Sequence, residues 1–155
     1  GTGPPAMSMP KEAQVAEIEV NKKTGVVKVL KMTDVHDVGY PVNPASVHGQ
    51  IEGSIVMGIG STLYEVLKFQ EGRVVNPSFS KYILPRATSI PEIESIFIET
   101  KDPQGPFGAK GMGEASLLPT AAAIANALYD ALGIRITELP ITPEKVLKAL
   151  KEKEV

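Results

Sequence analysis

Apolar and polar residues recur along this chain in two rhythms, one typical of strands and one typical of helices. Residues 13–20 and 26–35 are dense in β-branched side chains and flank a short turn, which predicts a β-hairpin. Short strands and turns are expected from 71–100, where the apolar alternation over 93–100 is the clearest strand pattern. A further short strand is expected over 134–137.

Three helices are predicted from longer apolar periods and from their terminal residues. Asn43 and Pro44 are typical of a helix N-terminus, so a first helix is expected over about 44–67. A second is expected over 114–132, directly after a glycine-rich turn, and a third begins after Thr142. The sequence therefore predicts an α+β fold with an N-terminal β-hairpin, two long helices with glycine-rich N-terminal turns, short strands and a C-terminal helix.

The first of these helices is unusually rich in glycine, with Gly49, Gly53, Gly58 and Gly60 in its expected span. Each interior glycine costs about 0.5–1 kcal/mol relative to alanine, so an isolated helix of this composition is unfavourable. We therefore expect another helix, a strand or a ligand to approach its backbone closely.

Length and composition are those of one soluble globular domain. Of the 155 residues, 43% are hydrophobic and 22% are charged. Residues 1–12 are expected to form an extended arm and 13–155 a single domain. Sixteen basic and eighteen acidic residues give a net charge of −2, which favours neither a nucleic acid nor a membrane surface as a partner. No secretory signal or membrane span is apparent, so a cytoplasmic location is expected.

Residue types also limit the metal chemistry of the chain. It has no cysteine, which excludes disulfides, thiolate zinc sites and iron–sulfur clusters held by its own side chains. It has two histidines, His36 and His48, and no H-E-x-x-H spacing. A metal held wholly by this chain is therefore not expected.

The glycine-rich run at 108–114, Gly-Ala-Lys-Gly-Met-Gly-Glu, is the most informative stretch. At the start of a helix, unpaired N–H groups and the dipole would favour an anion here, and glycines would let it approach the backbone. Lys110 would add a cation, unless it is simply solvated. The dipole would also favour an ionised Glu114 that is ready to accept a proton. The alternative is a capping carboxylate, which the dipole favours by about 0.3–1 kcal/mol.

Other candidates carry weaker evidence. The amide of Gln50, flanked by glycines, offers donors and an acceptor to a heterocycle edge or a phosphate, although a surface glutamine is the alternative. His36 and Asp37 resemble an acid–base pair, but adjacent residues rarely face one another, and a histidine bonded to backbone is the alternative. Arg86 would clamp an anionic substrate or lie on a loop. No P-loop or G-x-S-x-G motif occurs, although a phosphate- or nucleotide-binding domain using the glycine turn stays open.

Several motifs occur together in chain order. They are His36-Asp37-Val38-Gly39, Asn43-Pro44, Gly49-Gln50-Ile51-Glu52-Gly53, Gly58-Ile59-Gly60, Leu63-Tyr64-Glu65, the run from Gly105 to Glu114, the run from Ala121 to Asp130, and the run from Glu138 to Val146. As a set they resemble the C-terminal molybdopterin-binding region of the xanthine dehydrogenase/aldehyde oxidoreductase family of molybdenum hydroxylases. The resemblance covers nearly the whole chain beyond the first dozen residues.

This resemblance implies a molybdenum cofactor whose metal is ligated by the pterin and not by the protein. It implies that Glu114 is the active-site base, which takes a proton from a molybdenum-bound hydroxyl before the oxygen attacks an electron-poor carbon and hydride passes to a sulfido ligand. Gln50 matches a glutamine that contacts the pterin. Gly111, Met112 and Gly113 match the backbone that lines the metal site.

The resemblance also implies hydroxylation of an aldehyde or N-heterocycle with water as the oxygen source. Electrons would leave through iron–sulfur clusters, often to FAD, on other domains or subunits. Ala115-Ser116 replaces the Pro-Pro of typical xanthine dehydrogenases, which argues against xanthine as the substrate. The family's earlier molybdenum-domain segments are not in this chain, so we expect it to supply part of a site and to be inactive without partner segments. A non-catalytic scaffold module of a larger oxidoreductase is the alternative.

Overall fold

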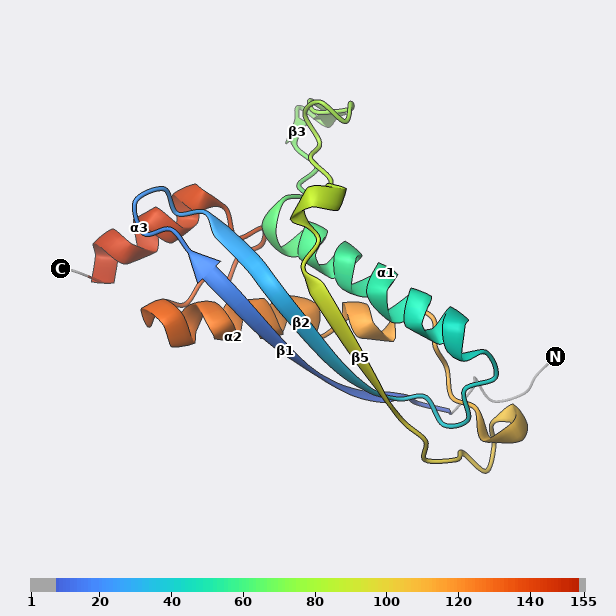
Figure 1. Ribbon diagram of the computed structural model, residues 1–155. Coiled ribbons are helices and arrows are strands. Elements are labelled where there is room, and N and C mark those ends of the chain that lie inside the picture. Colours follow the sequence, from blue (N-terminus) through green and yellow to red (C-terminus); the bar gives the residue numbers. More distant parts are fainter. Residues whose placement is uncertain (1–7, 154–155) are drawn as a thin grey trace.

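Three strands form the main sheet of this structure, a computed structural model that describes residues 8–153. Strands β1 (Lys11–Val20) and β2 (Val27–Asp37) pair antiparallel, and β5 (Glu92–Ile98) pairs parallel with β2. The order β1-β2-β5 places β2 in the centre, and the chain crosses from β2 to β5 through helix α1 (Pro44–Leu63) (Figure 1). The predicted α+β class and the N-terminal hairpin are confirmed.

A register shift in the hairpin determines which side chains face the core. Opposite Glu17 and Ile18, β2 accommodates one extra residue, Leu30, as a bulge. The inward-facing residues of β2 therefore change from odd to even numbers along the strand. They are Val27, Val29, Met32, Asp34 and His36, all of them buried.

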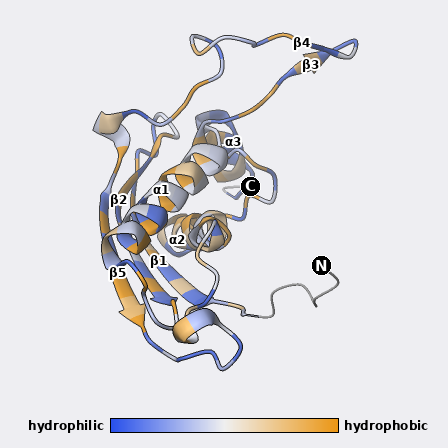
Figure 2. Ribbon diagram, turned by 90° about the vertical axis from the view of Figure 1, so that its right-hand side faces the viewer, coloured by the Kyte–Doolittle hydropathy of each residue, from blue (hydrophilic) through white to orange (hydrophobic). Residues whose placement is uncertain are grey.

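Helices α1 and α2 (Thr120–Leu132) lie on the same side of the sheet (Figure 2). Their buried apolar residues recur every four positions, which forms a ridge on each helix. The ridge of α1 consists of Val47, Ile51, Ile55, Ile59 and Leu63, and that of α2 of Ile124, Leu128 and Leu132. Burying each such side chain is worth about 1.5–3 kcal/mol.

Both predicted helix starts that carry proline at the first position are confirmed. The Asn43 side chain accepts a hydrogen bond from the backbone N–H of Ser46, so it caps α1. Helix α3 (Pro143–Lys153) begins where Thr142 indicated, and its fully buried Val146 closes the end of the core beside the hairpin turn (Figure 1).

The segment 64–91 projects from the sheet and carries the short ribbon of β3 (Phe69–Gln70) and β4 (Arg73–Val74) (Figure 1). Two of its aromatic side chains are largely exposed, Phe69 to 64% and Phe79 to 82%. Such exposed apolar groups are typical of a surface that contacts another part of an assembly.

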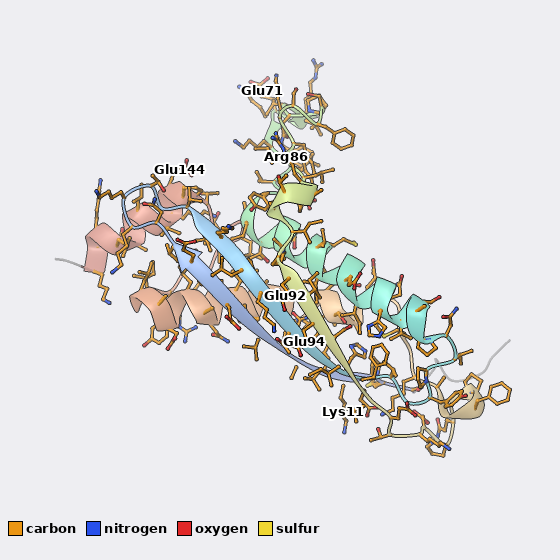
Figure 3. All side chains as sticks on the ribbon, in the orientation of Figure 1. Lys11, Glu71, Arg86, Glu92, Glu94 and Glu144 are labelled. Carbon is orange, nitrogen blue, oxygen red and sulfur yellow. The ribbon has the colours of Figure 1, made fainter. Side chains whose placement is uncertain are left out.

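Charged side chains lie on the outer face of the sheet, along its edge strand β5. Glu92 and Glu94 lie along β5 (Figure 3), and Lys31 of β2 forms ion pairs with both, at 3.3 and 2.8 Å.

Several predicted boundaries are wrong. The first helix ends at Leu63 and not at 67. The second begins at Thr120 and not at 114, because Pro119 lacks the N–H that a helix interior needs and would collide with the preceding turn. A separate 3-10 turn occupies Ala115–Leu117, so the glycine-rich turn does not run directly into α2.

Two further expectations fail at the edges of elements. Residues 134–137 are irregular, since no strand of the described chain lies beside them to pair with. Strand β1 begins at Lys11, so the last two residues of the arm expected over 1–12 belong to the strand, while 1–7 lie outside the described residues. Within 8–153, each helix is too short or too polar to cross a membrane.

Candidate functional site

A hydrogen bond joins two of the predicted site segments, which lie 63 residues apart in the sequence. The side-chain Nε2 of Gln50 donates to the carbonyl oxygen of Gly113 over 2.6 Å. Gln50 lies on the exposed side of α1, and Gly113 and Glu114 are exposed as well. The structure therefore brings Gln50, Gly113 and Glu114 together on one surface.

The glycine-rich loop is held to the end of β2 by backbone contacts. Gly39 and Ala109 form an antiparallel bridge, in which Tyr40 N–H donates to Gly108 over 3.0 Å and Lys110 N–H donates to Val38 over 3.0 Å. Gly39 has a φ of 63°, and a Cβ added there would lie 2.2 Å from the Gly108 oxygen. Only glycine allows this close approach.

Lys110 is neither an anion-binding cation nor a solvated lysine. Its Nζ lies 2.6 Å from Asp37 Oδ2 and donates to Thr100 Oγ1 over 2.8 Å, and both charged side chains are only 10% exposed. Burial acts to raise the pKa of Asp37, but hydrogen bonds from Lys110, Thr100 and Gly39 outweigh it and hold that pKa well below its ordinary value. The pair therefore fixes the start of the loop and offers no free charge to a ligand.

Glu114 differs from the predicted helix-terminal residue. It precedes a 3-10 turn of three residues, and α2 starts six positions later, so the dipole of a long helix does not act on it. Its side chain makes no capping hydrogen bond, which contradicts the capping alternative. Glu114 is exposed, as are its neighbour Gly113 and Gln50.

The backbone beside Glu114 is open to a ligand. A Cβ added at Gly113 would meet nothing within 4 Å, and one at Gly111 would approach only Ser8 and Pro10, at 3.6 and 4.0 Å. Met112, between them, is half-buried and lines a small apolar pocket with Val38 and Val47. The loop is thus anchored at Met112, while Gly113 faces open space.

A buried polar group lies directly below Glu114, and sequence reasoning missed most of it. Ser116 is fully buried, its carbonyl oxygen accepts from Gln14 Nε2 over 2.7 Å, and its Oγ lies 3.2 Å from His36 Nδ1. The same histidine nitrogen lies 3.3 Å from Glu12 Oε2 and 3.6 Å from Asp34 Oδ1. The sequence feature that could have revealed this buried group is the presence of polar residues at strand positions that face inward.

His36 and Asp37 do not form an acid–base pair, as expected for adjacent residues. The two side chains leave β2 in opposite directions, because neighbouring strand residues alternate, so His36 faces Ser116 and Asp37 faces Lys110. His36 is also fully buried, which excludes the loop histidine of the alternative. Arg86 lies on the projecting segment (Figure 3), and no hydrogen bond or ion pair within 8–153 joins it to the loop.

A cavity of about 880 Å³ lies elsewhere in the described chain. It is lined by the hairpin turn at Lys22 and Lys23, by the end of α2 and by α3. It contains none of the predicted site residues, and its lining of exposed lysines gives no directed chemistry. The Gln50 and Glu114 surface is therefore the better candidate.

Comparison with known proteins identifies the class. A family model described as molybdopterin cofactor-binding domain matches residues 1–91, which includes Gln50 but not the loop of Glu114. The 6-hydroxypseudooxynicotine dehydrogenase complex subunit gamma of Paenarthrobacter nicotinovorans is 38% identical over 91% of this chain and 18% of its own length. From the same organism, the nicotine 6-hydroxylase large subunit is 43% identical over 86% of this chain and 17% of its own length. The aldehyde oxidoreductase molybdenum-binding subunit PaoC of Escherichia coli K12 is 40% identical over 88% of this chain and 19% of its own length.

Solved structures agree with this result. The aldehyde oxidoreductase of Desulfovibrio gigas superposes with a TM-score of 0.85 at 36% identity, over 92% of this chain and 15% of its own. Quinoline 2-oxidoreductase of Pseudomonas putida 86 superposes with a TM-score of 0.83 at 33% identity, over 88% of this chain and 18% of its own. The chain belongs to the molybdopterin cofactor-binding domain family and is a molybdopterin-binding region of the molybdenum hydroxylases. It spans less than a fifth of the length of these relatives.

Proposed function

We propose that this chain supplies the catalytic base and part of the cofactor surface of a molybdenum hydroxylase. The single observation that carries the proposal is the Gln50–Gly113 hydrogen bond, which joins two predicted cofactor-contacting segments beside the uncapped carboxylate of Glu114. Chemistry at this surface needs a proton acceptor and a place for a flat heterocycle. Glu114 would be the proton acceptor, and the amide of Gln50 with the open backbone at Gly113 would receive the heterocycle.

The residues present fit a pterin cofactor. Gln50 uses its amide N–H for Gly113, which leaves its Oε1 for a donor on the pterin. The open backbone at Gly111 and Gly113 lets the cofactor approach closely. Gln50 and the stretch Gly111–Met112–Gly113 would therefore hold the cofactor, while the metal would take its ligands from the pterin.

The proposed reaction hydroxylates an aldehyde or an N-heterocycle: R–H and water give R–OH, two protons and two electrons. When bound, the molybdenum cofactor supplies an oxygen nucleophile derived from water and accepts the two electrons. Glu114 accepts the proton that the nucleophile loses, and its exposed position allows a substrate to reach it. Relatives whose names include aldehyde oxidoreductase, nicotine 6-hydroxylase and quinoline 2-oxidoreductase support these two substrate classes.

The experiment is Glu114→Gln in the assembled enzyme, assayed with benzaldehyde and quinoline as probe substrates. We expect turnover to be lost while molybdenum and pterin contents stay at the level of the unmodified enzyme, because the amide keeps the shape but cannot accept a proton. Glu19→Gln is the matched control, since Glu19 is an exposed glutamate on β1. Unchanged turnover in Glu114→Gln would instead favour the non-catalytic module.

The remainder of the site would come from other segments or subunits, which would also carry iron–sulfur clusters and a flavin for the departing electrons. Relatives named as subunits of larger complexes support this proposal. The exposed aromatic residues of segment 64–91 offer a contact surface for those partners. A photo-crosslinking residue at Phe79 should capture another segment or subunit of the assembled enzyme, and the absence of any crosslink would contradict this role.

A further inference from the structure

The geometry points to a positioning role for Gln14, His36 and Thr120: they orient Glu114 by fixing Ser116, two residues beyond it. This inference rests on the proposed function of Glu114 and adds residues that lie beneath the cofactor surface. None of the three would touch substrate or cofactor, because each acts through the turn that carries Glu114.

Hydrogen-bonding groups of the core contact both oxygen atoms of Ser116, its backbone carbonyl and its side-chain hydroxyl. Its carbonyl oxygen accepts from Gln14 Nε2 at 2.7 Å and lies 2.9 Å from Thr120 Oγ1. Its hydroxyl lies 3.2 Å from His36 Nδ1. Ser116 and Thr120 are fully buried, so water does not compete for these hydrogen bonds.

The fixed turn reaches back to Glu114. The N–H of Leu117 donates to the carbonyl oxygen of Glu114 over 3.1 Å, which closes the 3-10 turn on it. On the other side, Gln50 holds the carbonyl oxygen of Gly113. The backbone of Glu114 is therefore held from both directions while its carboxylate stays free. Such restraint on a catalytic group is what preorganisation requires.

Gln14 has a single orientation in this arrangement because both ends of its amide are used. One N–H donates to Ser116 and the other to Asp34 Oδ2, each at 2.7 Å. Its Oε1 accepts from Thr120 over 2.9 Å. An amide with its two donors and its acceptor satisfied cannot rotate without losing hydrogen bonds, so β1 and β2 determine where Ser116 lies.

Core packing alone does not account for these polar residues. The positions of Gln14, Asp34 and His36 lie on the inward face of the sheet, where Glu12 and Ser95 are also polar and the remaining members are apolar. Apolar residues of similar volume usually stabilise a core as well as or better than a buried polar group. The hydrogen bonds of Gln14 and His36 instead converge on Ser116 in the turn of Glu114.

The chain offers a matched pair of variants for the test. Thr120 and Thr62 are both fully buried in helices, and each hydroxyl oxygen lies within hydrogen-bonding distance of the carbonyl oxygen four residues earlier, at 2.9 and 2.6 Å. Thr120→Val breaks the network, whereas Thr62→Val removes an equivalent bond that does not touch Ser116. In the assembled enzyme, we expect Thr120→Val to lower kcat by up to roughly a hundredfold with KM and molybdenum content retained, and Thr62→Val to keep the original kcat.

A second pair tests the atom of His36 that acts. Asparagine places a nitrogen close to the position of Nδ1, and glutamine places one close to that of Nε2. Because Nδ1 is the atom that faces Ser116, His36→Asn should keep more of the original kcat than His36→Gln. The reverse order would contradict the assignment.

Hydrogen exchange of the Leu117 and Leu118 amides in the assembled enzyme gives a readout that does not depend on turnover. Both amides close the 3-10 turn, and they should exchange faster in Thr120→Val than in Thr62→Val. Equal exchange and equal kcat in the two threonine variants, with turnover lost in Glu114→Gln, would overturn this inference and leave the proposed function intact. Full turnover in Glu114→Gln would overturn the proposed function and the positioning role with it.

Discussion

Gly58 of α1 lies directly against Thr120 of α2, so that a Cβ added at Gly58 would be 2.5 Å from the Cβ of Thr120. The two helices therefore cross at the residue that holds Ser116. The expectation that something approaches the glycine-rich helix closely is confirmed at this position. At Gly49 and Gly53 no described residue is this close, and an added Cβ would meet nothing within 4 Å of the described chain.

This contrast predicts opposite effects of one substitution. Gly58→Ala should destabilise the fold by roughly 1–3 kcal/mol, because the new methyl group overpacks the crossing of the helices. Gly53→Ala should instead stabilise it by up to about 1 kcal/mol, because alanine favours the helix and the space is open. Urea unfolding of the purified chain measures both values. Equal effects would show that the helices do not meet at Gly58.

The ion pair of Lys110 and Asp37 should make stability depend on acid. Since the pKa of Asp37 is lower in the folded chain than its ordinary 3.8, its contribution is fully present above that value and is lost as the pH falls towards the folded pKa. Asp37→Asn should cost roughly 3 kcal/mol at neutral pH, because it leaves Lys110 nearly buried without its partner. The difference between the two proteins should shrink below pH 3.8.

Urea unfolding across this pH range checks the prediction, and Glu19→Gln serves as an exposed control. A cost for Asp37→Asn that is independent of pH would mean that the ion pair does not stabilise the loop.

Glu12 should show the opposite pH dependence. Burial raises its pKa above the ordinary 4.5, and the Asp34 carboxylate adds to the rise, although the charge of His36 acts against it. Because this pKa is raised on folding, protonated Glu12 stabilises the fold below pH 4.5. This contribution is lost as the pH rises through the pKa of Glu12 in the folded chain. The ionised Glu12 is therefore a cost at neutral pH.

Glu12→Gln should remove that cost and let an amide N–H reach the Oδ1 of Asp34, which has no hydrogen-bond partner within 8–153. We expect a gain on the order of 1 kcal/mol at neutral pH, the net value of a typical hydrogen bond. The gain should disappear below pH 4.5, where the protonated glutamate of the original protein is as neutral as the glutamine that replaces it. Unfolding curves that coincide at neutral pH would contradict this expectation.

The elements that the sequence predicts well are those whose own residues determine them. The hairpin follows from its dense β-branched residues and the turn between them, β5 from its apolar alternation, and the start of α1 from the Asn43-Pro44 cap. The predicted start of α2 at residue 114 is wrong because Pro119, at the N-terminus of the observed helix, cannot lie inside a helix. Residues 134–137 have strand-like composition but no neighbouring strand, and pairing is a tertiary property.

The site shows the same division. The motifs single out Gln50 and Glu114, but no spacing rule places two residues 64 positions apart on one surface. Lys110 looked like a free cation because its partner Asp37 lies 73 positions away. Polar residues at inward strand positions, such as Gln14 and Asp34, could have indicated the buried network. Their target Ser116 could not be found without the fold.

Gln50 supplies the last prediction, which concerns cofactor retention. Gln50→Met keeps the length of the side chain but removes the N–H that holds Gly113 and the oxygen proposed to accept from the cofactor. Losing one hydrogen bond of about 1 kcal/mol weakens binding roughly fivefold, so molybdenum and pterin contents should fall after dialysis of the assembled enzyme. Gln70→Met is the control, since Gln70 is exposed on the projecting ribbon. Equal cofactor contents in the two variants would exclude Gln50 from the cofactor surface. A selective loss in Gln50→Met, with Glu114→Gln still fully loaded, would separate cofactor binding by α1 from proton transfer by the loop.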